Sequence, residues 1–582
     1  MTARSFRIGD RDFLLDGEPF RVISGALHYF RVHPDQWRDR IRMGRMMGLN
    51  TIETYVAWNE HSPERGVFDT AGRLDLARFL QEVHDEGMHA IVRPGPYICA
   101  EFDGGGLPAW LFRDGDVAIR STDPRFLADV SAYLRDVMAI VAPLQVDRGG
   151  PVILLQVENE YGAYGDDHDY LRALAALFRE YGASVPLTTV DQPEARMLEA
   201  GGIPELHKTG SFGSRAAERL DVLRAQQPTG PLMCSEFWCG WFDHWGAHHH
   251  TTEPGDSARE LDALLAAGAS VNVYMLHGGT NFGLTNGANH KGVYQPTVTS
   301  YDYDAPLDEA GRPTPKFWAF REVISRHAPV PAFAPAPAEP FAVPPPARLR
   351  HVGALADLLE ARWSAHADVP TMDDVGIARG LARYTARLDV GADPVVLAFA
   401  GVRDRAWVSL DGTPVASLSR EAHERAVTLP TGTGRLEILV EDEGRVNYGV
   451  RIGERKGLIG PATVDGVPLT GWRIAPVPID LLPQTQAAGA PRRAGASVWR
   501  ATVALSGPAD LAMSTDGLGK GIAWINGFCL GRYWRKGPQA SLFVPAPATR
   551  AGENEITILE LETLTATEIG FADDLRLGHT ES

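Results

Sequence analysis

Short runs of apolar and β-branched residues alternate with longer amphipathic stretches between Phe20 and Ile324. This alternation is typical of repeated βα units, in which helices cover a sheet of parallel strands. The eight runs are Arg21–Ser24, Thr51–Val56, His89–Val92, Val152–Val157, Val185–Val190, His207–Phe212, Leu232–Phe237 and Val271–Leu276. Because eight βα units close into a cylinder, the pattern predicts a TIM (β/α)8 barrel.

Amphipathic stretches between these runs predict the helices that cover the barrel. They span residues 34–48, 74–87, 123–141 and 168–182. Proline opens the first stretch and glycine closes the second, which is the usual asymmetry of helix ends.

The second half of the chain has a different pattern, after a segment rich in proline and alanine. Eight of the twenty residues from Ala328 to Ala347 are proline, which favours an extended linker. Strand-like alternation follows, and segments 405–412 and 434–440 resemble segments 521–527 and 552–559 at nearly the same offset. Two copies of one β-sandwich explain the match, with chance similarity as the alternative. The predicted domains are residues 1–327, the linker 328–347, and β-sandwiches at 348–485 and 486–582.

Composition excludes several classes of function. Lys and Arg number 56 against 74 Asp and Glu, so the net charge of −18 repels nucleic acid. The chain is 44% hydrophobic and 22% charged, a globular composition that requires no membrane. Its four cysteines are too few for a disulfide framework, and the first ten residues lack an apolar signal segment. We therefore expect a cytoplasmic protein.

Two acids at the ends of apolar runs are the candidates for chemistry. The run 152–157 leads directly into Glu158, Asn159 and Glu160, and the run 232–237 contains Glu236. Strand alternation predicts that Glu158 and Glu160 share one face. A pair of carboxyl groups at the mouth of a barrel fits the hydrolysis of a glycosidic bond.

A series of motifs makes this expectation more specific. The motifs are Gly25-Ala26-Leu27-His28-Tyr29, Glu53-Thr54-Tyr55-Val56-Ala57-Trp58-Asn59, Arg93-Pro94-Gly95-Pro96-Tyr97-Ile98-Cys99-Ala100-Glu101, Gly105-Gly106-Leu107-Pro108, Gln156-Val157-Glu158-Asn159-Glu160-Tyr161-Gly162, Ser235-Glu236-Phe237, Gly278-Gly279-Thr280-Asn281-Phe282 and Thr299-Ser300-Tyr301-Asp302-Tyr303-Asp304. In this order they resemble the β-galactosidases of glycoside hydrolase family 35. Segments 524–527 and 531–534 extend the resemblance towards the C-terminus.

The resemblance implies a TIM barrel followed by two galactose-binding-like jelly rolls. It further implies that terminal, non-reducing β-D-galactose is released with retention of configuration and without metal or other cofactor. Glu160 is then the acid/base and Glu236 the nucleophile, with carboxyl groups about 5 to 5.5 Å apart. The residues that would line the galactose subsite are Tyr55, Ala100, Glu101, Asn159 and Tyr301.

Some positions depart from the family pattern. Ala57 and Ser62 replace Pro and Glu of many members, and Leu284 replaces a Tyr that would offer a hydrogen bond to sugar. The run His248-His249-His250 is not expected to bind metal, because adjacent side chains diverge.

Other functions and finer details stay open at this stage. An exo-β-glucosaminidase of the same family and a non-catalytic carbohydrate-binding protein are the alternatives. The compact chain is similar to bacterial members that prefer β-1,3-linked galactose. A homo-oligomer is neither indicated nor excluded.

Overall fold

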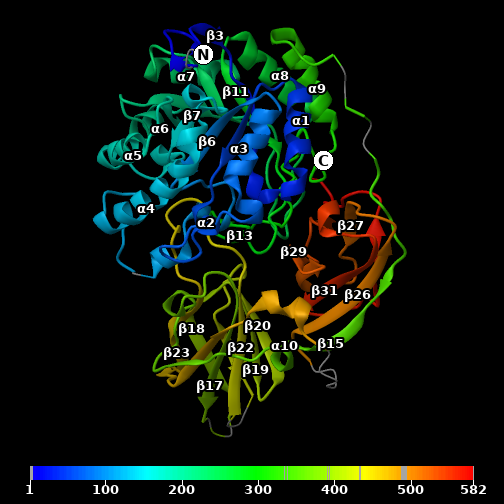
Figure 1. The fold of residues 1–582 in the computed structure, drawn as a ribbon. Helices are drawn as coiled ribbons and strands as arrows, with labels where there is room; N and C mark the ends of the chain where they lie inside the picture. The colour runs from blue at the N-terminus through cyan, green and yellow to red at the C-terminus, as the bar shows by residue number, and fades with distance from the viewer. Residues whose placement is uncertain are drawn as a thin grey trace.

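The computed structural model describes residues 4–113, 115–332, 335–336, 339–389, 391, 393–430, 434–486 and 494–580. Figure 1 shows three bodies: a large α/β body that contains the N-terminal half, and two smaller β bodies formed by the rest of the chain. No helix in the described ranges is long and apolar enough to span a bilayer.

Eight parallel strands form a closed barrel. Their order around it is β10-β11-β4-β5-β6-β7-β8-β9, so strands adjacent in sequence are adjacent in space. The bounds are β4 Ile23–Leu27, β5 Thr51–Tyr55, β6 His89–Gly95, β7 Val152–Val157, β8 Leu187–Asp191, β9 His207–Ser211, β10 Met233–Trp238 and β11 Ser270–His277. Each of the eight predicted runs contains or overlaps one of these strands, which confirms the TIM barrel.

Helices follow the strands and cover the barrel (Figure 1). They are α1 Trp37–Met47, α3 Leu76–Asp85, α4 Pro124–Val141, α5 His168–Glu180, α6 Ala195–Ala200, α7 Ala216–Gln226, α8 Pro254–Ala266 and α9 Pro315–His327. The predicted starts at residues 34 and 74 fall in short 3-10 turns that precede α1 and α3. Gly48 ends α1 with a φ of 109°, a left-handed conformation that suits glycine. The short helix α2 Trp58–His61 follows β5, and a small sheet of β1 Phe6–Ile8, β2 Phe13–Leu15 and β3 Glu18–Phe20 precedes the barrel.

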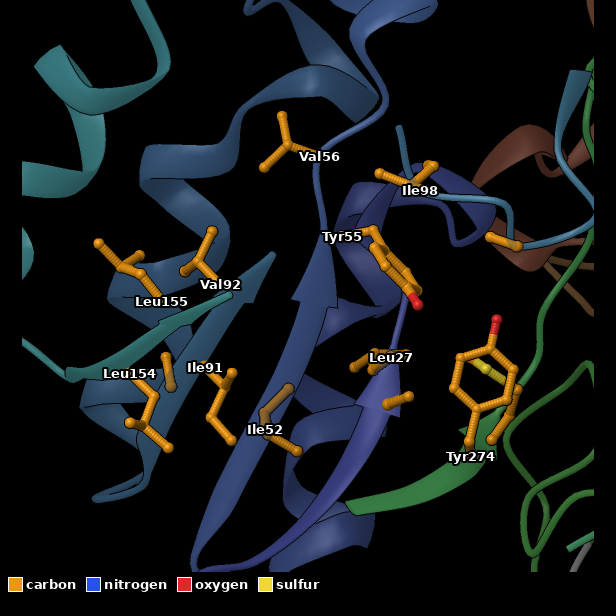
Figure 2. Close-up of a cluster of buried hydrophobic side chains, with 14 of the residues drawn as sticks. Leu27, Ile52, Tyr55, Val56, Ile91, Val92, Ile98, Leu154, Leu155 and Tyr274 are labelled. Atoms are coloured by element: carbon orange, nitrogen blue, oxygen red, sulfur yellow. The ribbon is translucent and has the colours of Figure 1, made fainter. Parts of the chain in front are cut away.

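Apolar side chains of the strands form one continuous core with the helices. In Figure 2, Ile52, Ile91 and Leu154 lie side by side on three neighbouring strands. The rings of Tyr55 and Tyr274 contact each other at 6.4 Å between centroids, at the edge of the cluster drawn there. The core therefore supports two phenol groups, one at the end of β5 and one within β11.

The two β bodies repeat one strand order. In the first, one sheet runs β16-β25-β17-β22-β19-β20 and the other β21-β18-β23-β24. In the second, the sheets run β15-β26-β31-β28-β29 and β30-β27-β33. The central strands β17-β22-β19-β20 and β26-β31-β28-β29 correspond one to one, and each body has its own apolar core between its sheets. The sequence similarity between segments 405–440 and 521–559 therefore coincides with equivalent strands.

The bounds of these strands are as follows. The first body contains β16 Ser364–His366, β17 Gly380–Leu388, β18 Val395–Arg403, β19 Arg405–Leu410, β20 Thr413–Ser419, β21 Ala426–Leu429, β22 Gly434–Asp442, β23 Gly457–Val464, β24 Val467–Pro468 and β25 Trp472–Pro476. The second contains β14 Ala347–Arg348, β15 Arg350–Ala354, β26 Ser497–Leu505, β27 Leu511–Ser514, β28 Lys520–Ile525, β29 Phe528–Trp534, β30 Ser541–Val544, β31 Gly552–Glu560, β32 Glu568–Ile569 and β33 Phe571–Ala572.

The pairing of β14 and β15 differs from the predicted domain division. Residues 348–354 were assigned to the first β-sandwich, but β15 pairs with β26 and β14 pairs with β32 of the second body. An edge-to-face contact between the rings of His351 and Trp499, with centroids 5.0 Å apart, reinforces the β15–β26 pair. Alternation marks a strand but does not identify its partner, so the sequence alone could not reveal this exchange.

Leu284 also has a different role from the expected one. It is buried in an apolar cluster with Leu381 and Trp524, at the junction of the barrel with both β bodies. Its side chain therefore contributes to domain packing, which is a sufficient reason for an apolar residue at this position.

Candidate active site

The seven residues singled out as a site gather at one end of the barrel. All of them are buried, and they come from the C-terminal ends of five strands or from the loops that follow. They are Tyr55 on β5, Ala100 and Glu101 after β6, Asn159 and Glu160 after β7, Glu236 on β10 and Tyr301 after β11. This is the end at which barrel enzymes carry their catalytic groups.

Glu236 is held by three donors. Its Oε1 accepts hydrogen bonds from Tyr55 Oη at 2.7 Å and from Arg93 Nη2 at 2.6 Å, and its Oε2 accepts one from Trp238 Nε1 at 3.2 Å. Charge-assisted bonds of this length stabilise an ionised carboxylate and fix its orientation. Glu236 is therefore arranged as a pre-oriented anion.

Glu160 has a contrasting environment. Its Oε1 accepts a hydrogen bond from Ser211 Oγ at 2.6 Å, and Ser211 pairs with Glu236 across the β9–β10 ladder. Burial, and next the negative charge of Glu236, raise the pKa of Glu160 to about 7. Glu160 can therefore carry a proton near neutral pH while Glu236 carries charge, which is the division that acid catalysis requires.

Glu158 is separated from this pair, contrary to the prediction that it shares a face with Glu160. Strand β7 ends at Val157, and the φ angles of 61° at Glu158 and 44° at Glu160 are left-handed, so alternation no longer applies. Arg120 donates two bonds to Glu158, at 3.0 and 2.7 Å, and Tyr170 Oη donates a third at 2.9 Å. Glu158 is a structural counter-ion.

The remaining predicted residues form a polar wall around the two acids. Asn159 Oδ1 accepts a hydrogen bond from Arg93 and lies 3.0 Å from Tyr55 Oη. Tyr301 Oη donates to Glu101 Oε2 at 2.5 Å. Burial raises the pKa of Glu101 to about 7, against the opposing effect of this hydrogen bond.

Two arginines that sequence reasoning did not assign to the site organise this wall. Arg93 binds both Asn159 and Glu236, and Arg31 stacks on the ring of Tyr301 at 3.7 Å from its centroid. Arg31 also donates to the carbonyl oxygen of Ala100 at 2.6 Å. Arg93 directly follows an apolar run, so the rule that singled out the acids could also have found it.

A loop of the first β body completes the mouth of the barrel. Arg445 N donates to Asp103 Oδ1 at 2.7 Å, and Tyr97 Oη donates to the carbonyl oxygen of Asn447. Tyr448 packs against the barrel core, and burial and then the charge of Glu160 raise its pKa. No local pattern in the sequence signals this contact, because its two sides lie in different domains.

A cavity of about 450 Å³ is lined by side chains that contact the two acids. Ser211 and Trp238, which bind Glu160 and Glu236, are among its lining residues, together with Trp241 and Gln192. Its aromatic and polar lining lies one side chain away from the two acids and could contact a second sugar unit.

Two of the three consecutive histidines share a carboxylate partner. Asp243 contacts His249 Nδ1 at 2.7 Å and His250 Nδ1 at 2.9 Å. Within the described ranges, no group of three or more His, Cys, Asp or Glu side chains is arranged to hold a metal ion. The histidine run is therefore part of a polar contact with Asp243.

A closed βα barrel that brings two acids together with different environments is typical of glycoside hydrolases. Comparison with known sequences agrees. The pattern described as "Glycosyl hydrolases family 35" matches residues 12–327. Patterns described as "Beta-galactosidase, first all-beta domain" and "Beta-galactosidase, galactose-binding domain" match residues 370–478 and 497–554.

Relatives match over nearly the whole chain. A beta-galactosidase of Xanthomonas manihotis is 40% identical and covers 92% of this chain and 91% of its own. Beta-galactosidases of Mus musculus and Bos taurus are 40% and 42% identical, covering 98% and 96% of this chain and 93% and 91% of their own. The chain is a glycoside hydrolase and belongs to family 35.

Proposed function

We propose that this family 35 enzyme is a retaining exo-β-galactosidase, which removes terminal, non-reducing β-D-galactose from oligosaccharides or glycoconjugates. The similarity to beta-galactosidases over nearly the full length supports the choice of sugar. The observation that carries the mechanism is the contrast between Glu160, whose pKa is raised to about 7, and Glu236, held by three donors.

The reaction proceeds by double displacement. A carboxylate oxygen of Glu236 bonds to the anomeric carbon while the glycosidic bond breaks, and Glu160 gives its proton to the departing oxygen. The resulting ester removes the charge of Glu236, which after burial is the largest influence that raises the pKa of Glu160. Glu160 then takes a proton from water as the water oxygen bonds to the anomeric carbon, and the bond from that carbon to Glu236 breaks, which releases galactose and restores the Glu236 carboxylate.

The polar wall supplies the recognition of galactose. Tyr55, Ala100, Glu101, Asn159 and Tyr301 present phenol, backbone, carboxyl and amide groups around the catalytic pair. Buried donors and acceptors of this kind reject a sugar that lacks the matching hydroxyl, because they would be left unpaired.

Burial of the two acids supports attack at a chain end. Glu160 is 8% and Glu236 6% exposed, so the reacting sugar must enter a pocket. A pocket of this kind suits a terminal sugar better than the middle of a long chain. The adjoining cavity lined by Trp238 and Trp241 would then hold the leaving part of the substrate.

The proposal is tested with nitrophenyl β-galactoside, β-glucoside and β-glucosaminide, and by NMR of the anomer that is formed first. We expect galactoside hydrolysis that yields the β-anomer first, and loss of activity in Glu236→Gln. Initial formation of the α-anomer would exclude retention. Faster cleavage of glucosaminide would identify the enzyme as a glucosaminidase, and hydrolysis undiminished in Glu236→Gln would exclude the nucleophile.

Two finer predictions belong to the proposal. Similarity to bacterial family members predicts a preference for β-1,3-linked galactose, which digestion of β-1,3, β-1,4 and β-1,6 galactosyl disaccharides decides. The four cysteines are free thiols, which fits a reducing compartment and hence the predicted cytoplasmic location. Cell fractionation tests the location.

A further inference from the structure

Three charged side chains form a buried row inside the barrel, beneath the sugar site. The guanidinium of Arg93 lies between two carboxylates: Nη2 is 2.6 Å from Glu236 Oε1, and Nε is 3.4 Å from Glu53 Oε1. Arg93 and Glu53 are each 1% exposed and Glu236 is 6% exposed. Arg93 thus makes its closer contact with the nucleophile and keeps a second, longer contact with Glu53.

Arg93 is the charged partner of Glu53, and the other side chains named here around Glu53 are uncharged. Asn272 Nδ2 is 3.3 Å from Glu53 Oε2, and Gln156, Thr188 and Ser235 line the same small cavity as Glu53 with uncharged side chains. Burial raises the pKa of Glu53 to about 7, Arg93 opposes this rise and the charge of Glu236 adds to it. Loss of charge at Glu236 therefore favours the ionised form of Glu53.

The first step of the double displacement removes the negative charge that lies closest to Arg93. When a Glu236 oxygen bonds to the anomeric carbon, the glycosidic carbon–oxygen bond breaks and Glu160 protonates the leaving oxygen, so the carboxylate becomes a neutral ester. Arg93 would then keep a buried positive charge beside a sugar that also carries positive charge in the transition state. A buried charge without a partner is strongly destabilising.

We propose that Glu53 is a positioning residue that becomes the counter-ion of Arg93 when Glu236 is esterified. The inference rests on the proposed retaining mechanism. With Glu53 ionised, Arg93 is shared between two anions before the reaction and stays neutralised in the covalent intermediate. Glu53 therefore makes Glu236 a better nucleophile and stabilises the glycosyl-enzyme, without touching the substrate.

The test uses Glu53→Gln in the full-length enzyme, with dinitrophenyl 2-deoxy-2-fluoro-β-galactoside as the trapping reagent at pH 8. Dinitrophenolate leaves without a proton, so Glu160 does not limit the step. We expect trapping to slow by about 100-fold, the effect of removing one pre-organised electrostatic partner. Reactivation of the isolated trapped enzyme should be as fast as in wild type or faster, because the intermediate itself is destabilised.

A merely structural role would slow trapping and reactivation alike, and that result would overturn the proposal, as would trapping at the wild-type rate. The matched control is Glu309→Gln, which changes another buried carboxyl, one that accepts hydrogen bonds from Thr280 and Ser300. It should leave both rates within about twofold of wild type.

The readout by mass spectrometry remains valid if only part of the Glu53→Gln variant folds. Mass spectrometry follows the labelled fraction of the molecules that can be trapped. The rate constants for trapping and for reactivation, and hence their ratio, therefore do not depend on how much of the variant folds. Mass spectrometry of wild type also separates the two proposals. A label that is absent from Glu236 would remove the proposed function itself, whereas a label on Glu236 with unchanged kinetics in Glu53→Gln would remove only the present inference.

Discussion

Removal of one hydroxyl group should shift the alkaline limit of the reaction. Ser211 Oγ donates to Glu160 Oε1 at 2.6 Å, and this bond opposes the rise in the pKa of Glu160 caused by burial and by Glu236. A hydrogen bond to a charged group contributes about 1.5 to 3 kcal/mol. Since one pKa unit corresponds to about 1.4 kcal/mol, Ser211→Ala should raise the pKa of Glu160 by about 1 to 2 units.

The sign follows from the role of Glu160. Glycosylation needs its protonated form, so kcat/KM falls as pH rises through this pKa, and a higher pKa moves the fall to higher pH. Phenyl β-galactoside is the suitable substrate, because its poor leaving group depends on the acid. Ser257→Ala is the control, since this buried hydroxyl donates to the backbone carbonyl of Cys239 at 3.3 Å. If kcat/KM of Ser211→Ala falls at the same alkaline pH as in wild type, either Glu160 is not the acid or the contact with Ser211 does not set its pKa.

Three further substitutions test buried residues that support the site and the domains. Glu158→Gln should lower the free energy of unfolding by about 3 to 5 kcal/mol in urea, because Arg120 loses its buried counter-ion; an unchanged midpoint would contradict this. Gly278→Ala would place a Cβ 1.5 Å from the carbonyl oxygen of Tyr301, so kcat/KM should fall about 100-fold or more in a folded protein checked by circular dichroism. Full activity would show that the loop adapts. Lys456→Met should cost about 3 to 5 kcal/mol in the same urea assay, since the buried Asp404 and Asp442 both lose the ammonium group that they share and, among the described residues, only Asp404 keeps an ion pair, with Arg420.

The barrel and its acids could be predicted because their signals are local. An apolar run identifies a buried strand, and a carboxyl group at its end lies at the functional face of a barrel, which sufficed for Glu160 and Glu236. The separation of Glu158 from Glu160 was missed, because it depends on two left-handed residues beyond the end of β7. Alternation is a property of strands and says nothing of the turn that follows.

Long-range pairing was the part that the sequence could not supply. The residues of strand β15 were assigned to the first β-sandwich, yet their partner strand β26 lies in the second β body. The approach of Tyr448 to Glu160 likewise joins segments from different domains. Such contacts arise from surfaces that exist only after each domain has folded, so no short pattern marks them.

The loop of the first β body at the barrel mouth bears on how the site forms during synthesis. Synthesis proceeds from the N-terminus, and early domains generally fold first. The barrel with both acids is complete before residues 445–448 leave the ribosome, yet the pocket still lacks the wall that these residues supply. A chain that ends before residue 445 would therefore carry both acids but lack the contacts that residues 445–448 make with the barrel.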